Sequence, residues 1–151
     1  MLFQPVDTCD GPTAVWLAER GWTVTGVDFS AAGLDKARQL AETRGVSAQW
    51  TVADVTEYEP TATDFDLVVV MYLQLPETSR RRAFRHAADA VAPGGTLVVV
   101  GPDSTNLTDG WGGPRAPAVL YGPDAATAAL DGLAIVKAHP VARPVTHDAA
   151  T

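Results

Sequence analysis

The sequence is poor in cysteine and in basic residues. Its 151 residues include a single cysteine, Cys9, so no internal disulfide can form. Eleven lysines and arginines stand against 18 aspartates and glutamates, which gives a formal net charge of −7. A nucleic-acid surface needs clustered basic residues, and so does a polybasic membrane anchor. We therefore expect neither nucleic acid nor a membrane as partner.

Long apolar segments are absent as well. No stretch approaches the roughly 18 apolar residues of a membrane-spanning helix. The first residues lack the basic region and apolar run of a secretory signal, so we expect a cytoplasmic protein. With 46% hydrophobic and 19% charged residues, the composition is that of a globular protein with one core. The length predicts one domain over residues 1–138, followed by a frayed Pro- and Ala-rich tail over 139–151.

Short apolar runs alternate with amphipathic segments along the chain. The runs predict strands at 3–9, 23–28, 48–52, 65–72, 96–100 and 133–137. Helices are expected over 13–20, 31–43, 76–91 and 123–130, with a tight turn at 93–95 and a long loop over 101–122. This order predicts an α/β fold, a Rossmann-like, mostly parallel open sheet with helices on both faces.

The third predicted helix carries the run Arg80-Arg81-Arg82. Such a run could bind phosphate, but the helical pattern favours a solvated face instead. Phe84, Ala87, Ala88 and Val91 would then point toward the core.

Acidic residues fall at the ends of the predicted strands. Asp7 ends the first strand and Gly11 follows in the turn, Asp28 ends the second strand, and Asp54 follows the third. Ligands of open α/β sheets bind at the carboxyl ends of the strands, and an acid after the second strand accepts hydrogen bonds from a nucleoside ribose. The same residues could coordinate Mg²⁺, but a nucleoside site with no metal is the reading we prefer.

Several segments together resemble the class I S-adenosylmethionine (SAM)-dependent methyltransferases. The resemblance covers roughly residues 6–137 and is carried by residues 14–30, by Val52-Ala53-Asp54-Val55, by Phe65-Asp66-Leu67-Val68, by Ala92-Pro93-Gly94-Gly95 and by residues 106–114. More narrowly, the chain is similar to the small bacterial tellurite-resistance and thiopurine methyltransferases. The resemblance implies SAM as cofactor and S-adenosylhomocysteine as product, with Asp28 on the ribose, Asp54 on the adenine amino group, and Phe29 and Val55 flanking the adenine.

The resemblance also suggests where the methionine end of the cofactor and the methyl acceptor bind. Asp7 and Gly11 belong to the turn that passes the methionine part, and Tyr72 follows the fourth strand near the transferred methyl group, as a candidate catalytic residue. Gln74, Trp111 and Tyr121 are candidates for the acceptor pocket. The expected reaction is in-line methyl transfer to a small-molecule acceptor.

Three departures from the family pattern leave an alternative open. The turn Asp7-Thr8-Cys9-Asp10-Gly11 is about two residues short. The chain is also expected to be trimmed at both ends, without the earlier helix that covers the cofactor in the family and without the family's seventh strand. The alternative is a catalytically silent domain that binds SAM weakly or serves in oligomerisation, through a homodimer that covers an exposed sheet edge. A nicotinamide-dependent enzyme is disfavoured because no Gly-x-Gly-x-x-Gly turn follows the first strand.

Overall fold

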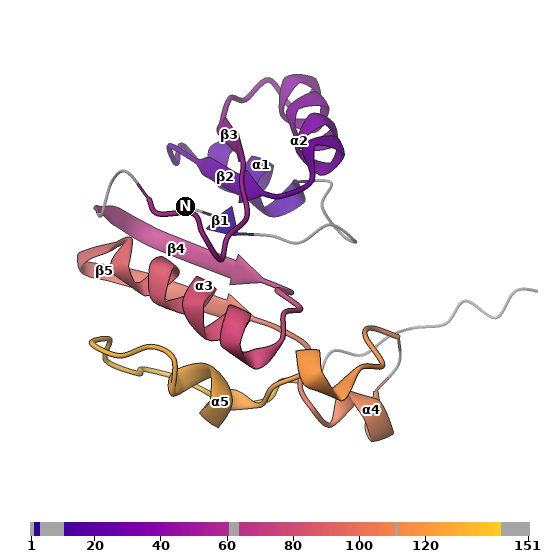
Figure 1. Cartoon of the computed structure of the whole chain (residues 1–151). Helices are drawn as coiled ribbons and strands as arrows, with labels where there is room; N and C mark the ends of the chain where they lie inside the picture. The colour runs from indigo at the N-terminus through magenta and orange to yellow at the C-terminus, as the bar shows by residue number, and fades with distance from the viewer. Residues whose placement is uncertain (1, 4–10, 61–63, 111, 143–151) are drawn as a thin grey trace, which may run out of the picture.

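The computed structural model contains a five-stranded parallel sheet with the strand order β3-β2-β1-β4-β5 (Figure 1). It describes residues 2–3, 11–60, 64–110 and 112–142. The strands are β1 (Leu2–Phe3), β2 (Thr25–Asp28), β3 (Gln49–Val52), β4 (Phe65–Met71) and β5 (Val91–Val100). All pairings run parallel, so the carboxyl ends of the strands lie along one edge, as the sequence predicts.

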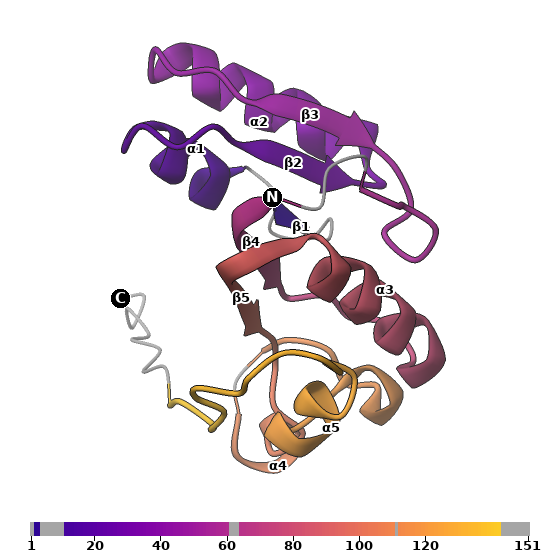
Figure 2. The ribbon, with the colours of Figure 1, turned by 90° about the vertical axis from the view of Figure 1, so that its left-hand side faces the viewer.

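Helices cover both faces of the sheet because β4 is apolar on both of its sides. Val68 and Val70 point into a core cluster with α3 (Glu77–Asp89), whereas Val69 points into a second cluster with α1 (Pro12–Ala18). Successive side chains of a strand alternate between faces, so one apolar run serves both layers. Figure 2 shows α1 and α3 on opposite sides of the sheet.

The helix α2 (Ala31–Thr43) has the predicted bounds. The hydroxyl of Ser30 accepts a 3.0 Å hydrogen bond from the backbone amide of Gly33, which caps the first turn. Leu34, Ala37 and Ala41 recur at helical spacing and are buried. The strand β3 lies beside β2 at an edge of the sheet, where Trp50 packs over Gly26; a Cβ on Gly26 would stand 2.6 Å from the indole ring.

The predicted turn at 93–95 is a bulge within β5. Phe65 pairs with Val91 and Leu67 with Thr96, so the residues between Val91 and Thr96 bulge outward. Gly94 has φ +82, and a Cβ on Gly95 would come within 2.8 Å of the carbonyl oxygen of Phe65. The fifth strand therefore begins five residues earlier than predicted.

The predicted sixth strand at 133–137 is wrong. These residues have no regular structure, and Ile135 and Val136 are 49% and 96% exposed. Strand-prone residues form a strand when a neighbouring strand pairs with them and their side chains are half-buried. None of the five strands pairs with this segment, so it stays irregular. Residues 139–142 are likewise exposed and irregular, and the rest of the predicted tail lies outside the described residues.

The loop predicted at 101–122 contains two short helical segments, α4 (Asn106–Asp109) and η2 (Pro117–Val119), and α5 (Pro123–Thr127) follows it. Of the predicted first strand at 3–9, the structure describes only Phe3, which belongs to β1. Residues 4–10 lie outside the described part. No helix in the described ranges is long and apolar enough to cross a membrane.

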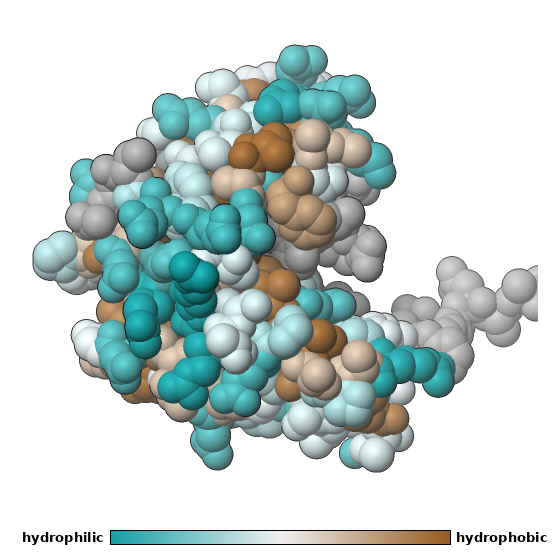
Figure 3. Space-filling view, in the orientation of Figure 1, coloured by the Kyte–Doolittle hydropathy of each residue, from teal (hydrophilic) through white to brown (hydrophobic). Residues whose placement is uncertain are grey.

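The outer face of α3 is hydrophilic, which partly confirms the prediction for its arginine run. Arg81, Arg82 and Arg85 are exposed, and the surface over α3 in Figure 3 is largely hydrophilic. Arg80 is the exception, because only 3% of its surface is exposed. The prediction of a solvated face is wrong for this residue, which lies one helical turn before Phe84 and shares its buried side.

Candidate cofactor site at the strand ends

The carboxyl end of β2 is formed by Asp28, which is 2% exposed. Its Oδ1 accepts a 2.8 Å hydrogen bond from the backbone amide of Ser30, so the carboxylate helps to form the turn into α2. An ionised carboxylate has about four lone-pair sites and can accept further bonds. The next residue, Phe29, is 62% exposed and presents an aromatic surface beside the strand end.

The sheet brings the end of β3 alongside Asp28. The backbone amide of Ala53 donates a 2.9 Å hydrogen bond to the carbonyl oxygen of Asp28, which places Asp54 one residue beyond this link. Asp54 is exposed, and hydrogen bonds from the backbone amide and hydroxyl of Thr56 hold its pKa below the usual value. The two acids selected from the sequence therefore follow adjacent strands.

The apolar residues around Asp54 divide between core and surface. Val55 is 6% exposed and belongs to the core cluster of Val27 and Val68, so its contact with adenine stays a prediction. Val52, the last residue of β3, is 52% exposed beside the end of β2. The sequence analysis missed Val52 as a candidate; its position opposite Asp28 in the strand register is the feature that identifies it.

The first turn of α1 lies against the end of β4. Gly11 caps α1 with φ +63, and Pro12 begins the helix at a position that needs no backbone donor. The hydroxyl of Thr13 donates a 3.4 Å hydrogen bond to the sulfur of Met71, the last residue of β4. The candidate residues Gly11 and Tyr72 thus flank a direct contact between these two elements.

Tyr72 has a strained backbone. With φ +54 it is the one non-glycine residue of the described ranges in the left-handed region, and its amide donates a 2.6 Å hydrogen bond to the carbonyl oxygen of Val100. A left-handed conformation costs a residue with a Cβ about 1–2 kcal/mol. Strain of this kind is found at functional sites, where surrounding structure holds it in place.

The remaining candidates are dispersed. Gln74 is half-buried just after β4, while Tyr121 lies in the core with 7% of its surface exposed. The Tyr121 hydroxyl abuts Gly101 at the end of β5, where a Cβ would stand 2.2 Å from the phenol oxygen. Asp7 and Trp111 lie outside the described residues, so their predicted roles stay predictions.

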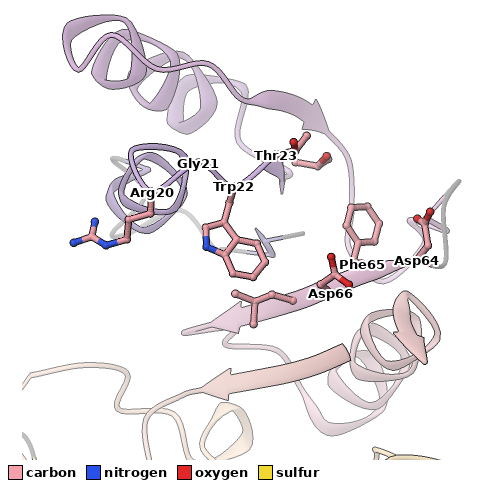
Figure 4. A pocket seen from close by; sticks show the side chains of 9 residues that line it. Arg20, Gly21, Trp22, Thr23, Asp64, Phe65 and Asp66 are labelled. Carbon is pink, nitrogen blue, oxygen red and sulfur yellow. The ribbon is translucent and has the colours of Figure 1, made fainter. Parts of the chain in front are cut away.

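One hollow in the surface lies away from these residues. A cavity of about 560 Å³ opens at the amino ends of β2 and β4 (Figure 4). Its lining includes Trp22, Thr23, Asp64 and Asp66. The candidate residues Asp28, Asp54 and Tyr72 all follow the opposite ends of their strands, so this cavity is not the candidate cofactor site.

No metal centre is apparent within the described ranges, where no group of three or more His, Cys, Asp or Glu side chains is placed to hold an ion. The side chains at the strand ends are instead a buried carboxylate, an exposed carboxylate, and the exposed apolar side chains of Phe29 and Val52. A ribose with two hydroxyls and a flat apolar base is the chemistry that such a set accommodates.

Comparison with known proteins identifies the family to which the chain belongs. The sequence profile of the family described as "Methyltransferase domain" matches residues 8–95, more than half of the chain. Over 81 residues the chain is 31% identical to the ubiquinone biosynthesis O-methyltransferase of Coxiella burnetii, a match that covers 54% of this chain and 35% of that protein. The chain thus spans about a third of the length of the curated relatives that it matches.

Two solved structures illustrate the likeness of the fold. The TehB-like SAM-dependent methyltransferase from Corynebacterium glutamicum is 25% identical, with a TM-score of 0.53 over 65% of this chain and 53% of that chain. The N-methyltransferase NodS from Bradyrhizobium japonicum, in complex with S-adenosylhomocysteine, is 22% identical, with a TM-score of 0.64 over 85% of this chain and 63% of that chain. Because the profile matches more than half of the chain, the chain belongs to the methyltransferase domain family, and its parallel sheet agrees with the Rossmann-like fold of class I SAM-dependent methyltransferases.

Proposed function

We propose that this protein is a SAM-dependent methyltransferase that acts on a small-molecule acceptor in the cytoplasm. The observation that carries the proposal is the carboxylate of Asp28 at the end of β2, next to two exposed apolar residues: Phe29, which follows it, and Val52, its register partner on β3. A carboxylate accepts hydrogen bonds from both ribose hydroxyls, and the apolar surfaces suit an adenine ring.

The residues present fit the adenosine half of SAM. Asp28 would bind the ribose, Asp54 would accept from the adenine amino group, and Phe29 with Val55 would flank the base. Because Asp28 is 2% exposed, its carboxylate must become accessible when the ribose binds. Asp7 and Gly11 are proposed for the methionine half; of these, Gly11 lies where α1 meets the end of β4.

SAM supplies, when bound, a methyl group on a sulfonium that is already a good leaving group. The chain's own task is to orient the acceptor in line with that methyl group and to exclude water, which lowers a barrier by up to about 7–11 kcal/mol. Tyr72 and Gln74 follow β4 and are proposed to position the acceptor. The strained backbone of Tyr72 fixes the direction of its side chain at this strand end.

The acceptor is proposed to be a small molecule because the net charge of −7 disfavours nucleic acid. Trp111 and Tyr121 are the other residues proposed for its pocket. The reaction would release S-adenosylhomocysteine, a ligand that can be tested for binding without knowledge of the acceptor.

Titration calorimetry with SAM and with S-adenosylhomocysteine tests the proposal. We expect saturable one-to-one binding of both ligands to folded protein. No binding at millimolar ligand, on protein shown to be folded by circular dichroism, would reject the proposed function. NAD⁺ serves as the comparison ligand, since it shares the adenosine but lacks the methionine, and it should bind at least tenfold more weakly.

We also propose a homodimer through an edge of the sheet, since β3 and β5 are the outer strands of the five. Unpaired edges favour pairing with another chain. Sizing chromatography with light scattering decides between a dimer of about twice 15.9 kDa and a monomer, which would contradict the proposal. A dimer without SAM binding would favour the alternative role in oligomerisation.

A further inference from the structure

Arg80 is buried within the protein although it begins a run of three arginines. It lies in the first turn of α3 and is 3% exposed, whereas Arg81, Arg82 and Arg85 on the same helix are exposed. A guanidinium stays charged at every physiological pH. Its environment must therefore compensate for the loss of water around a full positive charge.

The contact that the structure provides is the aromatic ring of Tyr121. The guanidinium carbon of Arg80 stands 4.5 Å from the ring centroid, and the same ring meets Phe84 edge-on at 5.8 Å. Among the described residues no hydrogen bond or ion pair holds the guanidinium. Its Nε is enclosed without a partner, and so is the hydroxyl of Tyr121.

The cation–π contact does not offset these costs by itself. A desolvated contact of this kind is weaker than the cost of taking an ion out of water. Each enclosed donor without an acceptor adds to that cost. Both unpartnered groups are donors, Nε–H on Arg80 and O–H on Tyr121, and they belong to one stacked pair. An anionic oxygen group is the kind of ligand that accepts from such donors and neutralises the charge.

The stacked pair lies at the same edge of the sheet as the proposed site. The first turn of α3 follows the residues after β4, and the Tyr121 hydroxyl rests against Gly101, the residue after β5. The residue before Gly101 is Val100, and its carbonyl oxygen accepts the backbone hydrogen bond from the amide of Tyr72. The hydroxyl of Tyr121 thus lies one residue along the chain from the backbone partner of Tyr72, at the strand end where the acceptor is proposed to bind.

We propose that Arg80 and the hydroxyl of Tyr121 bind a carboxylate group of the methyl acceptor, which makes Arg80 a specificity-determining residue. A planar carboxylate matches the fork of a guanidinium. A single positive charge suits a monoanion better than a phosphate dianion. The assignment of this carboxylate to the acceptor rests on the proposed function, but the existence of the anion site does not.

The direct test is a titration of the unaltered protein with benzoate, followed through the Arg80 Nε–H signal in ¹H–¹⁵N correlation spectra. Arg80→Lys, which lacks that signal, assigns it. We expect the signal to shift saturably with benzoate and to stay in place with neutral benzamide. Absence of a shift, or equal shifts with both probes, overturns the proposal, and a saturable shift with inorganic phosphate but not benzoate overturns the assignment to a carboxylate.

Variants give a second, independent readout. Arg80→Met should weaken benzoate binding at least tenfold, and Tyr121→Phe, which keeps the ring and removes only the hydroxyl, three- to tenfold. Arg85→Met is the matched control on the exposed side of α3 and should bind benzoate as the unaltered protein does. If Arg80→Met does not fold, Tyr121→Phe decides, and unchanged affinity in Tyr121→Phe removes that hydroxyl from the site.

Binding of S-adenosylhomocysteine, measured on the same samples, separates the two proposals. Benzoate binding without S-adenosylhomocysteine binding leaves the anion site standing and rejects the methyltransferase function. S-adenosylhomocysteine binding without benzoate binding leaves the methyltransferase function standing and rejects the anion site. Binding of both, with cofactor affinity unchanged in Arg80→Met, is the expected result.

Discussion

Gly11 lies directly against Ala37, where a Cβ on Gly11 would stand 2.5 Å from the Cβ of Ala37. This contact joins the start of α1 to the middle of α2, beside the proposed cofactor site. Gly11→Ala should therefore lower the free energy of unfolding by about 2–5 kcal/mol, because overpacking of about 1–3 kcal/mol adds to the cost of about 1–2 kcal/mol for a left-handed alanine. Urea unfolding measures the loss.

Gly45→Ala is the matched control for that substitution. Gly45 has φ +68, close to the +63 of Gly11, but nothing lies within 4 Å of an added Cβ. It should cost only the backbone part, about 1–2 kcal/mol. Equal losses for the two variants would mean that the contact with Ala37 is not tight.

Tyr72→Gly should separate stability from function. Glycine adopts φ +54 without penalty, so the backbone strain is relieved, while the half-buried side chain loses its packing. These effects are of similar size, and we expect the midpoint of thermal unfolding to change by less than about 5 °C. Methyl transfer, once an acceptor is known, should fall at least tenfold. A large loss of stability with unchanged turnover would show a purely structural role for Tyr72.

The helix α2 and the apolar strand β4 illustrate what could be predicted from the sequence. Ser30 before a helical stripe and the run from Leu67 to Val70 are local signals, and the structure confirms both. The acids after β2 and β3 were also predictable, because parallel strands place their carboxyl ends on one edge. Long-range pairing then decides which of the strand-prone segments becomes a strand, and 133–137 does not.

Arg80 and Val52 illustrate what could not be predicted. The arginine run looks uniformly polar, and burial of its first member depends on Tyr121, which comes from the other end of the domain. The exposure of Val52 depends on β3 being an edge strand, a property of the strand order. Neither feature has a local signal, because each arises from contacts between distant segments.

The phenol of Tyr121 should make stability fall at high pH. Burial raises the pKa of Tyr121 to about 12, above the usual value near 10, and the nearby charge of Arg80 opposes this only in part. A raised pKa in the folded state favours the neutral phenol there. Its contribution, on the order of 2–3 kcal/mol, is complete below pH 10 and is lost as the pH rises from 10 to 12.

Unfolding by urea at pH 9, 10 and 11 measures that loss. The informative quantity is the difference between the unaltered protein and Tyr121→Phe, because effects common to the two proteins cancel. The unaltered protein should lose more stability than Tyr121→Phe as the pH rises through this range. Parallel pH profiles for the two proteins would contradict the burial of a neutral phenol.

The central claim is that Asp28 holds the cofactor ribose, and calorimetric titration of S-adenosylhomocysteine into Asp28→Asn tests it most directly. Asparagine keeps an oxygen that can accept from the Ser30 amide, so the turn into α2 should persist. Asp89→Asn, at the exposed end of α3, is the control of equal charge. The account predicts at least tenfold weaker binding for Asp28→Asn, about 1.4 kcal/mol, with Asp89→Asn unchanged. Equal affinity in all three proteins would contradict it.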